Sequence, residues 1–351
     1  MKRISRRIFL SSSAGAAAAV ISGAASDRVR VGIIGLGRRG GLHAWGFSRA
    51  PNVDVCLLCD LKPARLDRFA AVVARTRNRM PATSTAYQEV LDRPDIDAVA
   101  IALPERLRSA AVHRALEAGK HVLLDPNGLI GLKESLLMER EAQSRGLLID
   151  LSQDYVPVQR YMASAGLDAG EWQTVSGRLL IGGTAASLTE QAFGGLELAR
   201  RILGCMFPTA IAAFELSGVS CAASFSFAED GYPGRSLHWE VRRQPSASAI
   251  PDRHVVSVHA DGDRDSRFAE WTLPRESDIT FKPGREPFQA FAGAVRQRDA
   301  RQLLMPLAEG RVTSALIRLA AIAGKAGRPL RFDPMEERLV GESSGLQEKL
   351  G

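Results

Sequence analysis

Three glycines near the start of the chain have the spacing of a phosphate-binding loop. Gly35, Gly37 and Gly40 follow an apolar, largely β-branched run from Val29 to Ile34, and a helix-compatible pattern begins at Gly40. In such a loop the first glycine permits a tight turn, the second lets the backbone approach a pyrophosphate, and the third lets the helix pack against the strand. The N-terminus of that helix presents free N–H groups to the phosphates. The stretch therefore predicts a dinucleotide site.

A carboxylate follows the next strand, where the ribose of a dinucleotide would be bound. The apolar run 53–59 ends at Asp60, 20 residues after Gly40, and an acid at this spacing typically hydrogen-bonds the ribose 2′-hydroxyl. Because it repels a 2′-phosphate, Asp60 favours NAD over NADP, whereas Arg38 or Arg39 would reverse that preference by pairing with the phosphate. The alternative role for Asp60 is the N-cap of the helix that follows.

Strands and helices alternate through the first 150 residues. Strands are expected at 29–34, 53–59, 96–103, 121–124 and 147–149, a short strand or loop at 80–83, and helices at 61–75, 87–91, 107–118 and 132–144. This alternation is typical of a parallel sheet, which binds ligands at the carboxyl ends of its strands. The residues predicted to bind the cofactor, NAD or NADP, are therefore Gly35, Leu36, Gly37, Arg38, Arg39, Gly40, Asp60, Leu103, Pro104, Asp125 and Asn127.

The pattern changes after residue 150. Helices are expected at 155–165, 188–203, 287–298 and 308–325, and alternating runs predict strands at 172–181, 210–216, 223–227, 237–241, 255–259 and 268–273. Turn-rich segments between these strands favour an antiparallel sheet. The predicted fold class is α/β: an N-terminal Rossmann doubly wound parallel sheet at 28–150, then a C-terminal α+β domain at 151–340 with an open, mainly antiparallel sheet. A ligand cleft is expected between the two domains.

The first 25 residues have the pattern of a twin-arginine export signal. Arg6 and Arg7 precede a weakly apolar run from Ala14 to Ala25 that ends in small residues suited to cleavage. An uncleaved membrane anchor is the alternative, although the run is short and rich in alanine and glycine for a bilayer span. We therefore expect export to the periplasm or the cell surface of a bacterium, with a soluble chain after cleavage.

Composition and charge exclude some partners. Charged residues make up 24% and apolar residues 45% of the 351 residues, an ordinary balance for a globular chain of two domains. The net charge is +7, and four of these charges lie in the signal, so the remainder does not predict nucleic-acid binding. The basic stretch 75–79 is interpreted as a solvated face. Cys56 and Cys59 lie on opposite faces of a strand, and no cysteine or histidine spacing predicts a metal site.

Several segments carry the motifs of one protein family. They are Val31–Gly40, Asp95–Val99 with Leu103–Pro104, Ala115–Val122, Leu198–Gly204, Phe291–Arg298, Ala308–Gly310 and Phe332–Pro334. On these segments the chain resembles the glucose–fructose oxidoreductase / inositol dehydrogenase (Gfo/Idh/MocA) family, in its exported bacterial branch. The resemblance implies oxidation of a sugar or cyclitol hydroxyl with NAD or NADP, or glycoside cleavage through a redox cycle. It also implies a dimer formed through the C-terminal sheet.

The chain departs from the family at the positions that usually carry proton transfer. The family's lysine, which follows its Gly-Lys-His-Val strand, is Pro126 here, and its general-base histidine falls at Gly194. A histidine of the Pro104 loop is replaced by Arg108, and an arginine before the Tyr-x-Pro stretch is replaced by Asp154. Oxidation of an alcohol needs a group that accepts the hydroxyl proton, so the usual route is absent.

Other residues near these positions are candidates for the missing proton acceptor. Glu190, Asp125 and Tyr155 are the predicted catalytic residues, because a carboxyl group or phenol beside the cofactor can take the proton. Each has a plain alternative role as a cap or surface group. The sequence therefore supports two hypotheses: an oxidoreductase for carbohydrates with replaced catalytic residues, or a non-catalytic nucleotide-binding member that partners a catalytic paralogue. The substrate is not readable from the sequence.

Overall fold

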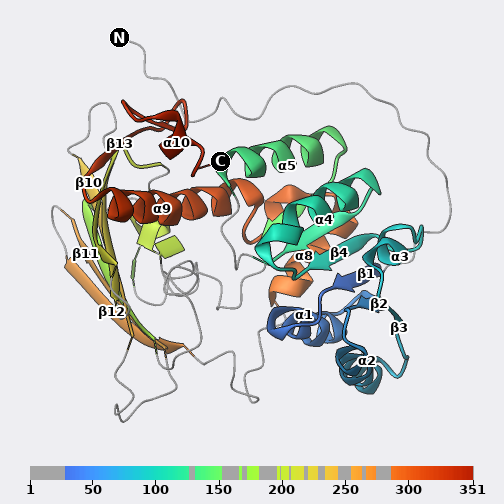
Figure 1. Cartoon of the computed structure of the whole chain (residues 1–351). Coiled ribbons are helices and arrows are strands. Elements are labelled where there is room, and N and C mark those ends of the chain that lie inside the picture. Colours follow the sequence, from blue (N-terminus) through green and yellow to red (C-terminus); the bar gives the residue numbers. More distant parts are fainter. Residues whose placement is uncertain are drawn as a thin grey trace, which may run out of the picture.

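The chain folds into two sheets with helices packed around and between them (Figure 1). The computed structural model describes residues 28–125, 131–151, 166–167, 172–181, 196–197, 199–204, 207–216, 220–227, 234–243, 254–262, 266–273 and 286–350. The expected signal at 1–25, the helix at 155–165 and the start of the helix at 188–203 lie outside these residues.

The first sheet is parallel and has six strands in the order β3-β2-β1-β4-β5-β6. This is the doubly wound order of a Rossmann domain, so the predicted class of the N-terminal half is confirmed. Apart from the edge strand β3, the strands consist mostly of buried apolar residues, as burial on both faces of a parallel sheet requires. Their bounds are β1 Val29–Ile34, β2 Val53–Cys59, β3 Ala82–Ser84, β4 Ala98–Ile101, β5 His121–Leu124 and β6 Ile149–Leu151.

Five helices connect these strands, and their bounds are α1 Arg38–Arg49, α2 Pro63–Arg77, α3 Tyr87–Leu91, α4 Glu105–Glu117 and α5 Leu132–Ser144. The predicted helices agree within a few residues. The start of α1 is an exception that matters for the site: the helix begins at Arg38 with Gly37 as its N-cap, not at Gly40. The two arginines of the loop therefore already belong to the helix.

The second sheet has eight strands in the order β12-β11-β7-β10-β9-β8-β13-β14. Neighbouring strands run antiparallel except for the parallel pair β7 and β10, so the prediction of a mainly antiparallel sheet is confirmed. The bounds are β7 Thr174–Ile181, β8 Ala210–Leu216, β9 Ser220–Phe227, β10 Arg235–Arg243, β11 His254–Asp261, β12 Ser266–Leu273, β13 Leu330–Asp333 and β14 Arg338–Leu339. A helical segment at 199–203 ends at Gly204, and the C-terminal helices are α8 Glu286–Gln297, α9 Leu307–Ala326 and α10 Ser344–Gln347.

Two helices from the end of the chain pack against the N-terminal half, and one of them, α9, also packs on the second sheet. Helix α8 packs on α1 of the first sheet, where Phe288 lies edge-on to Phe47 at 4.9 Å between ring centroids. Helix α9 packs on both β8 and α5, between the two sheets (Figure 1). The predicted boundary at residue 150 stays a prediction, but the packing of α8 shows that the chain returns to the N-terminal core after β12, before β13 and β14 complete the second sheet.

Candidate functional site

The glycine loop between β1 and α1 is fixed at two of its three glycines by the protein's own packing. Gly35 has a positive φ of 86°, and a Cβ added there would lie 2.4 Å from the carbonyl oxygen of Ala102. A Cβ added at Gly40 would lie 1.7 Å from the carbonyl oxygen of Gly35. A side chain at Gly35 would collide with the turn after β4, and one at Gly40 would push helix α1 away from the end of β1. These glycines therefore serve the fold as well as any ligand.

Gly37 is different because nothing in the described structure requires it to be glycine. A Cβ added there meets no atom within 4 Å, and its φ of −66° is one that any residue adopts. The open space lies at the N-terminus of α1, where the first N–H groups of a helix have no partner within the helix. A phosphate group is the ligand that this combination of open space and free N–H groups suits. The loop therefore fits the pyrophosphate of a dinucleotide.

Asp60 ties the loop to the end of β2. Its Oδ2 accepts the backbone N–H of Leu36 at 2.7 Å, and its Oδ1 accepts that of Lys62 at 2.9 Å. Arg65 donates to Oδ2 at 3.3 Å. Burial alone would raise the pKa of Asp60, but these three hydrogen bonds outweigh it and hold the pKa below its usual value. The N-cap of α2 is Lys62, so Asp60 is an ionised carboxylate beside the loop rather than a helix cap.

Arg39 makes a buried ion pair with Asp125. Its Nε donates to Asp125 Oδ1 at 2.9 Å, and both residues are less than one-tenth exposed. Asp125 follows β5, which lies three strands from β2 and so about 14 Å away across the sheet. Arg39 is therefore held on the side of the loop away from Asp60. Of the two arginines considered for a 2′-phosphate, only Arg38, which is exposed, remains.

The turn after β4 completes the described rim of the site. Leu103 is half-buried, and Pro104 is exposed and forms the N-cap of α4. Arg108, which takes the place of a family histidine, is buried and donates from Nη2 to the Leu103 carbonyl oxygen at 3.1 Å. Its observed contact therefore supports the turn.

Most of the predicted catalytic residues cannot be placed. Asn127, Pro126, Asp154, Tyr155, Glu190 and Gly194 lie outside the described residues. Asp125 is the catalytic candidate that the structure describes, and its carboxylate is paired with Arg39. The catalytic roles of Glu190, Asp125 and Tyr155 thus stay predictions.

The sequence reasoning missed a buried charged cluster beside the helix at 199–203. Glu197 is fully buried and pairs with Arg200 at 3.0 Å and with Arg201, while Thr313 on α9 donates a hydrogen bond to it. Burial would raise the pKa of Glu197, but Arg200 and Arg201 outweigh it and hold the pKa below its usual value. Arg200 also reaches Glu309 on α9 at 2.7 Å. The spacing of one acid with arginines three and four residues later was the available signal.

The described residues hold neither a candidate metal site nor a candidate membrane span. They contain no group of three histidine, cysteine or acidic side chains placed to hold a metal ion. They also contain no helix with the length and apolar character that a bilayer span needs.

Comparison with known proteins agrees with this geometry. Residues 29–126 match the model of the oxidoreductase family with an NAD-binding Rossmann fold, Gfo/Idh/MocA. A glycosyl hydrolase family 109 protein of Shewanella sp. (strain W3-18-1) is 34% identical over 103 residues, which are 28% of this chain and 22% of that protein. An α-N-acetylgalactosaminidase of Shewanella oneidensis is 34% identical over 101 residues, with the same shares. The chain thus matches about a fifth of the length of these relatives.

Solved structures extend the likeness to the whole fold. Scyllo-inositol dehydrogenase from Lactobacillus casei, solved with NAD(H) and scyllo-inositol, has a TM-score of 0.68 at 15% identity and covers 87% of this chain and 99% of its own. Myo-inositol 2-dehydrogenase from Lactobacillus plantarum has a TM-score of 0.68 at 16% identity, covering 87% and 100%. The strand order and glycine loop define a Rossmann nucleotide-binding domain joined to a large mixed sheet. With the match over residues 29–126, this first domain is similar to the NAD-binding Rossmann domain of the Gfo/Idh/MocA oxidoreductases.

Proposed function

We propose that the chain is an exported NAD-dependent oxidoreductase that acts on a hydroxyl group of a sugar, cyclitol or glycoside. The observation that carries the proposal is the open space at Gly37, which the protein's own packing leaves unexplained and a pyrophosphate would fill. Asp60, held ionised beside the loop, supports NAD over NADP because a carboxylate repels a 2′-phosphate. The pairing of Arg39 with Asp125 supports the same choice.

The bound nicotinamide would accept a hydride from the carbinol carbon of the substrate. The hydroxyl proton must then pass to a residue of the chain. Asp125 is paired with Arg39, an arrangement suited to holding the loop and the end of β5 together. We therefore assign the proton-accepting role to Glu190 or Tyr155, in place of the residues lost at Pro126 and Gly194. This assignment is tested by Glu190→Gln and Tyr155→Phe in the assay below.

The relatives support a carbohydrate or glycoside as the substrate. The L. casei neighbour binds a cyclitol, and the S. oneidensis relative is an α-N-acetylgalactosaminidase. The shared residues of that relative cover only the nucleotide-binding half of this chain, so its substrate does not carry over directly. A glycoside remains within the proposal because a redox cycle at a neighbouring hydroxyl activates the glycosidic bond for elimination.

We also propose export by the twin-arginine route, on the basis of the pattern at residues 1–25. That route carries folded proteins, which suits a chain that must take up its nucleotide before it leaves the cytoplasm. For assembly we propose a homodimer, or a heteromer with a catalytic paralogue, through the outer face of the second sheet. That face is turned away from α9 (Figure 1). Phe268, which is 68% exposed, lines a shallow hollow of the second sheet together with Ser176 and His238.

The experiment is a turnover assay of the purified full chain with NAD and a panel of cyclitols, sugars and p-nitrophenyl glycosides. Absorbance at the NADH wavelength reports oxidation, and nitrophenol release reports glycoside cleavage. Activity that is lost in a Gly37→Asp variant supports the proposal. Tight NAD binding with no reaction on any member of the panel, and no reduction of bound NAD, favours the non-catalytic alternative.

A further inference from the structure

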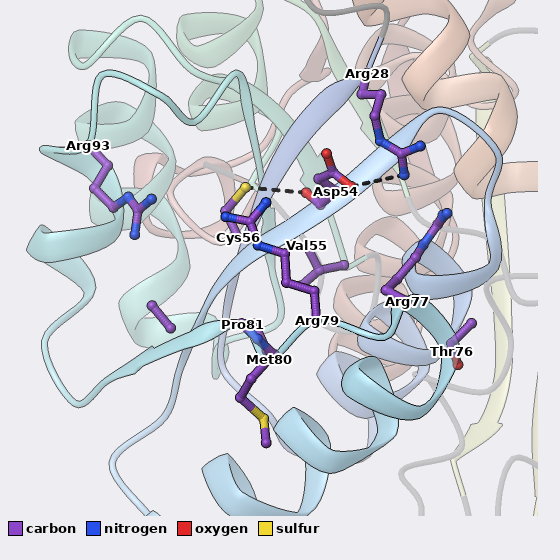
Figure 2. Close-up of a pocket in the computed structure, with 11 residues that line it drawn as sticks. Arg28, Asp54, Val55, Cys56, Thr76, Arg77, Arg79, Met80, Pro81 and Arg93 are labelled. Atoms are coloured by element: carbon purple, nitrogen blue, oxygen red, sulfur yellow. Dashed lines mark hydrogen bonds and ion pairs between the residues drawn. The ribbon is translucent and has the colours of Figure 1, made fainter.

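A cavity lies at the amino-terminal end of the strands of the first sheet, opposite the end that carries the glycine loop. Figure 2 shows it between the start of β2, the end of α2 and the segment leading to β3. Its volume is about 600 Å³. Because β1 is six residues long, this end of the sheet is about 20 Å from the glycine loop. The described residues that line the cavity are Arg28, Asp54, Val55, Cys56, Thr76, Arg77, Arg79, Met80, Pro81, Ala82 and Arg93.

The lining is strongly basic. Four arginines reach it from three separate segments, and Asp54 is the one carboxylate among the described lining residues. Asp54 is paired with Arg28 at 2.9 Å, and Arg93 pairs with Asp95, outside the lining, at 2.5 Å. Arg79 makes no hydrogen bond or ion pair within the part of the chain that the structure describes. The cavity therefore keeps a positive charge that its own acidic residues do not balance.

Arg77 has a buried nitrogen without a hydrogen-bond partner among the described residues. It donates from Nη2 to the Phe47 carbonyl oxygen at 3.4 Å and to that of Ala50, while its buried Nε has no hydrogen-bond partner among the described residues. Burial lowers the pKa of Arg77, and repulsion from the nearby Arg28 lowers it further. Asp54 offsets part of this repulsion, and a further anion between Arg28 and Arg77 would relieve the rest.

We propose that this cavity, lined by Arg28, Arg77, Arg79 and Arg93, binds a ligand that carries two or more oxyanion groups, as phosphate or sulfate esters. Planar guanidinium groups match the geometry of such oxyanions and donate paired hydrogen bonds to them. The volume lies within the range of ordinary small-molecule sites and exceeds what one phosphate needs. The site is independent of the glycine loop and of the proposed oxidoreductase function.

The competing explanation is that the arginines form a solvated basic face, as the sequence of residues 75–79 indicates. A variant of Arg75 separates the two explanations. Arg75 is exposed on α2, the helix that also carries Arg77, but it does not line the cavity. Diffuse attraction of anions would depend on Arg75 as much as on Arg79. A built site would depend on the lining arginines, Arg79 and Arg93 among them, and not on Arg75.

The test is calorimetric titration of the purified full chain with pyrophosphate and, separately, with a disulfated disaccharide, in a chloride buffer at low salt. We expect saturable binding of at least one of these ligands, and the two arms separate a phosphorylated ligand from a sulfated glycan. Arg79→Ala and Arg93→Gln should each weaken the affinity about tenfold, the loss expected for a charge-assisted hydrogen bond. Arg75→Ala should change it less than about twofold.

Three results would overturn the proposal. The first is the absence of saturable binding by either ligand. The second is an equal loss of affinity in Arg75→Ala and Arg79→Ala. The third is the loss of pyrophosphate binding in Gly37→Asp, which would place the anion at the glycine loop. None of these depends on whether NAD binds or turns over, so a failure here is distinguishable from a failure of the proposed oxidoreductase activity.

Discussion

Replacing Gly37 by aspartate separates ligand binding from folding in the glycine loop. Gly37 is the N-cap of α1, and a Cβ added there meets no atom within 4 Å. Aspartate is among the preferred N-cap residues and its charge suits the positive end of the helix. The free energy of unfolding should therefore change by less than about 1 kcal/mol, with a small gain in stability expected.

The same substitution should remove nucleotide binding. The new side chain would occupy the space proposed for the pyrophosphate and add a negative charge at its oxygens. Charge-assisted hydrogen bonds contribute about 1.5–3 kcal/mol each. Losing two of them lowers the affinity for NAD by about a hundredfold or more. Gly37→Ala, which adds bulk without charge, should give a smaller loss.

The assay combines urea unfolding with calorimetric titration of NAD. Gly40→Ala is the matched control, since its Cβ would lie 1.7 Å from the carbonyl oxygen of Gly35. It should lower the stability by about 2 kcal/mol or more through overpacking. The reasoning is refuted if Gly37→Asp binds NAD as tightly as the parent chain, or if it destabilises the protein as much as Gly40→Ala does.

Three further predictions concern stability. Burial lowers the pKa of His43 to about 4, so protonation of this histidine favours the unfolded chain. The free energy of unfolding should therefore fall by about 2 kcal/mol between pH 7 and pH 5 because of His43. In urea titrations, His43→Gln should flatten that part of the pH profile. Glu197→Gln removes the buried carboxylate that pairs with Arg200 and Arg201, while Arg200 keeps its ion pair with Glu309, and it should cost about 3–5 kcal/mol in urea unfolding. Gly177→Ala places a Cβ 2.0 Å from Trp239 and should cost about 1–3 kcal/mol, with recovery in a double variant that also carries Trp239→Leu.

Each of these has a contradicting outcome. Equal pH profiles for the parent chain and His43→Gln would show that this histidine is not held neutral by burial. A loss below about 1 kcal/mol in Glu197→Gln would show that the buried cluster is not a stabilising link to α9. Neutral behaviour of Gly177→Ala would mean that the ring of Trp239 moves aside freely.

The central strands of the first sheet were predictable from the sequence because burial on both faces makes them largely apolar runs, whereas the exposed edge strand β3 was predicted only as a short strand or loop. The run 53–59 coincides with β2, for example. The ends of elements that depend on geometry were harder to predict. The start of α1 at Arg38 follows from the turn at Gly35, and β9 begins three residues before the predicted strand because its first residues are small and carry little pattern.

The contacts between distant segments were not predictable from local pattern. Arg39 and Asp125 are 86 residues apart, and neither position indicates that they pair. The packing of Phe288 against Phe47 joins segments 241 residues apart in the same way. A charged stretch gives no sign of whether it borders a cavity, so the role proposed for Arg79 emerged only from the arrangement of four segments.

The most direct test of the central claim is to denature the purified chain and measure the nucleotide that it releases, then titrate NAD into any fraction that released none. The account predicts close to one NAD per chain, carried through purification or bound on addition, with NADP bound more weakly because of Asp60. A chain that releases no nucleotide and binds neither NAD nor NADP would contradict it.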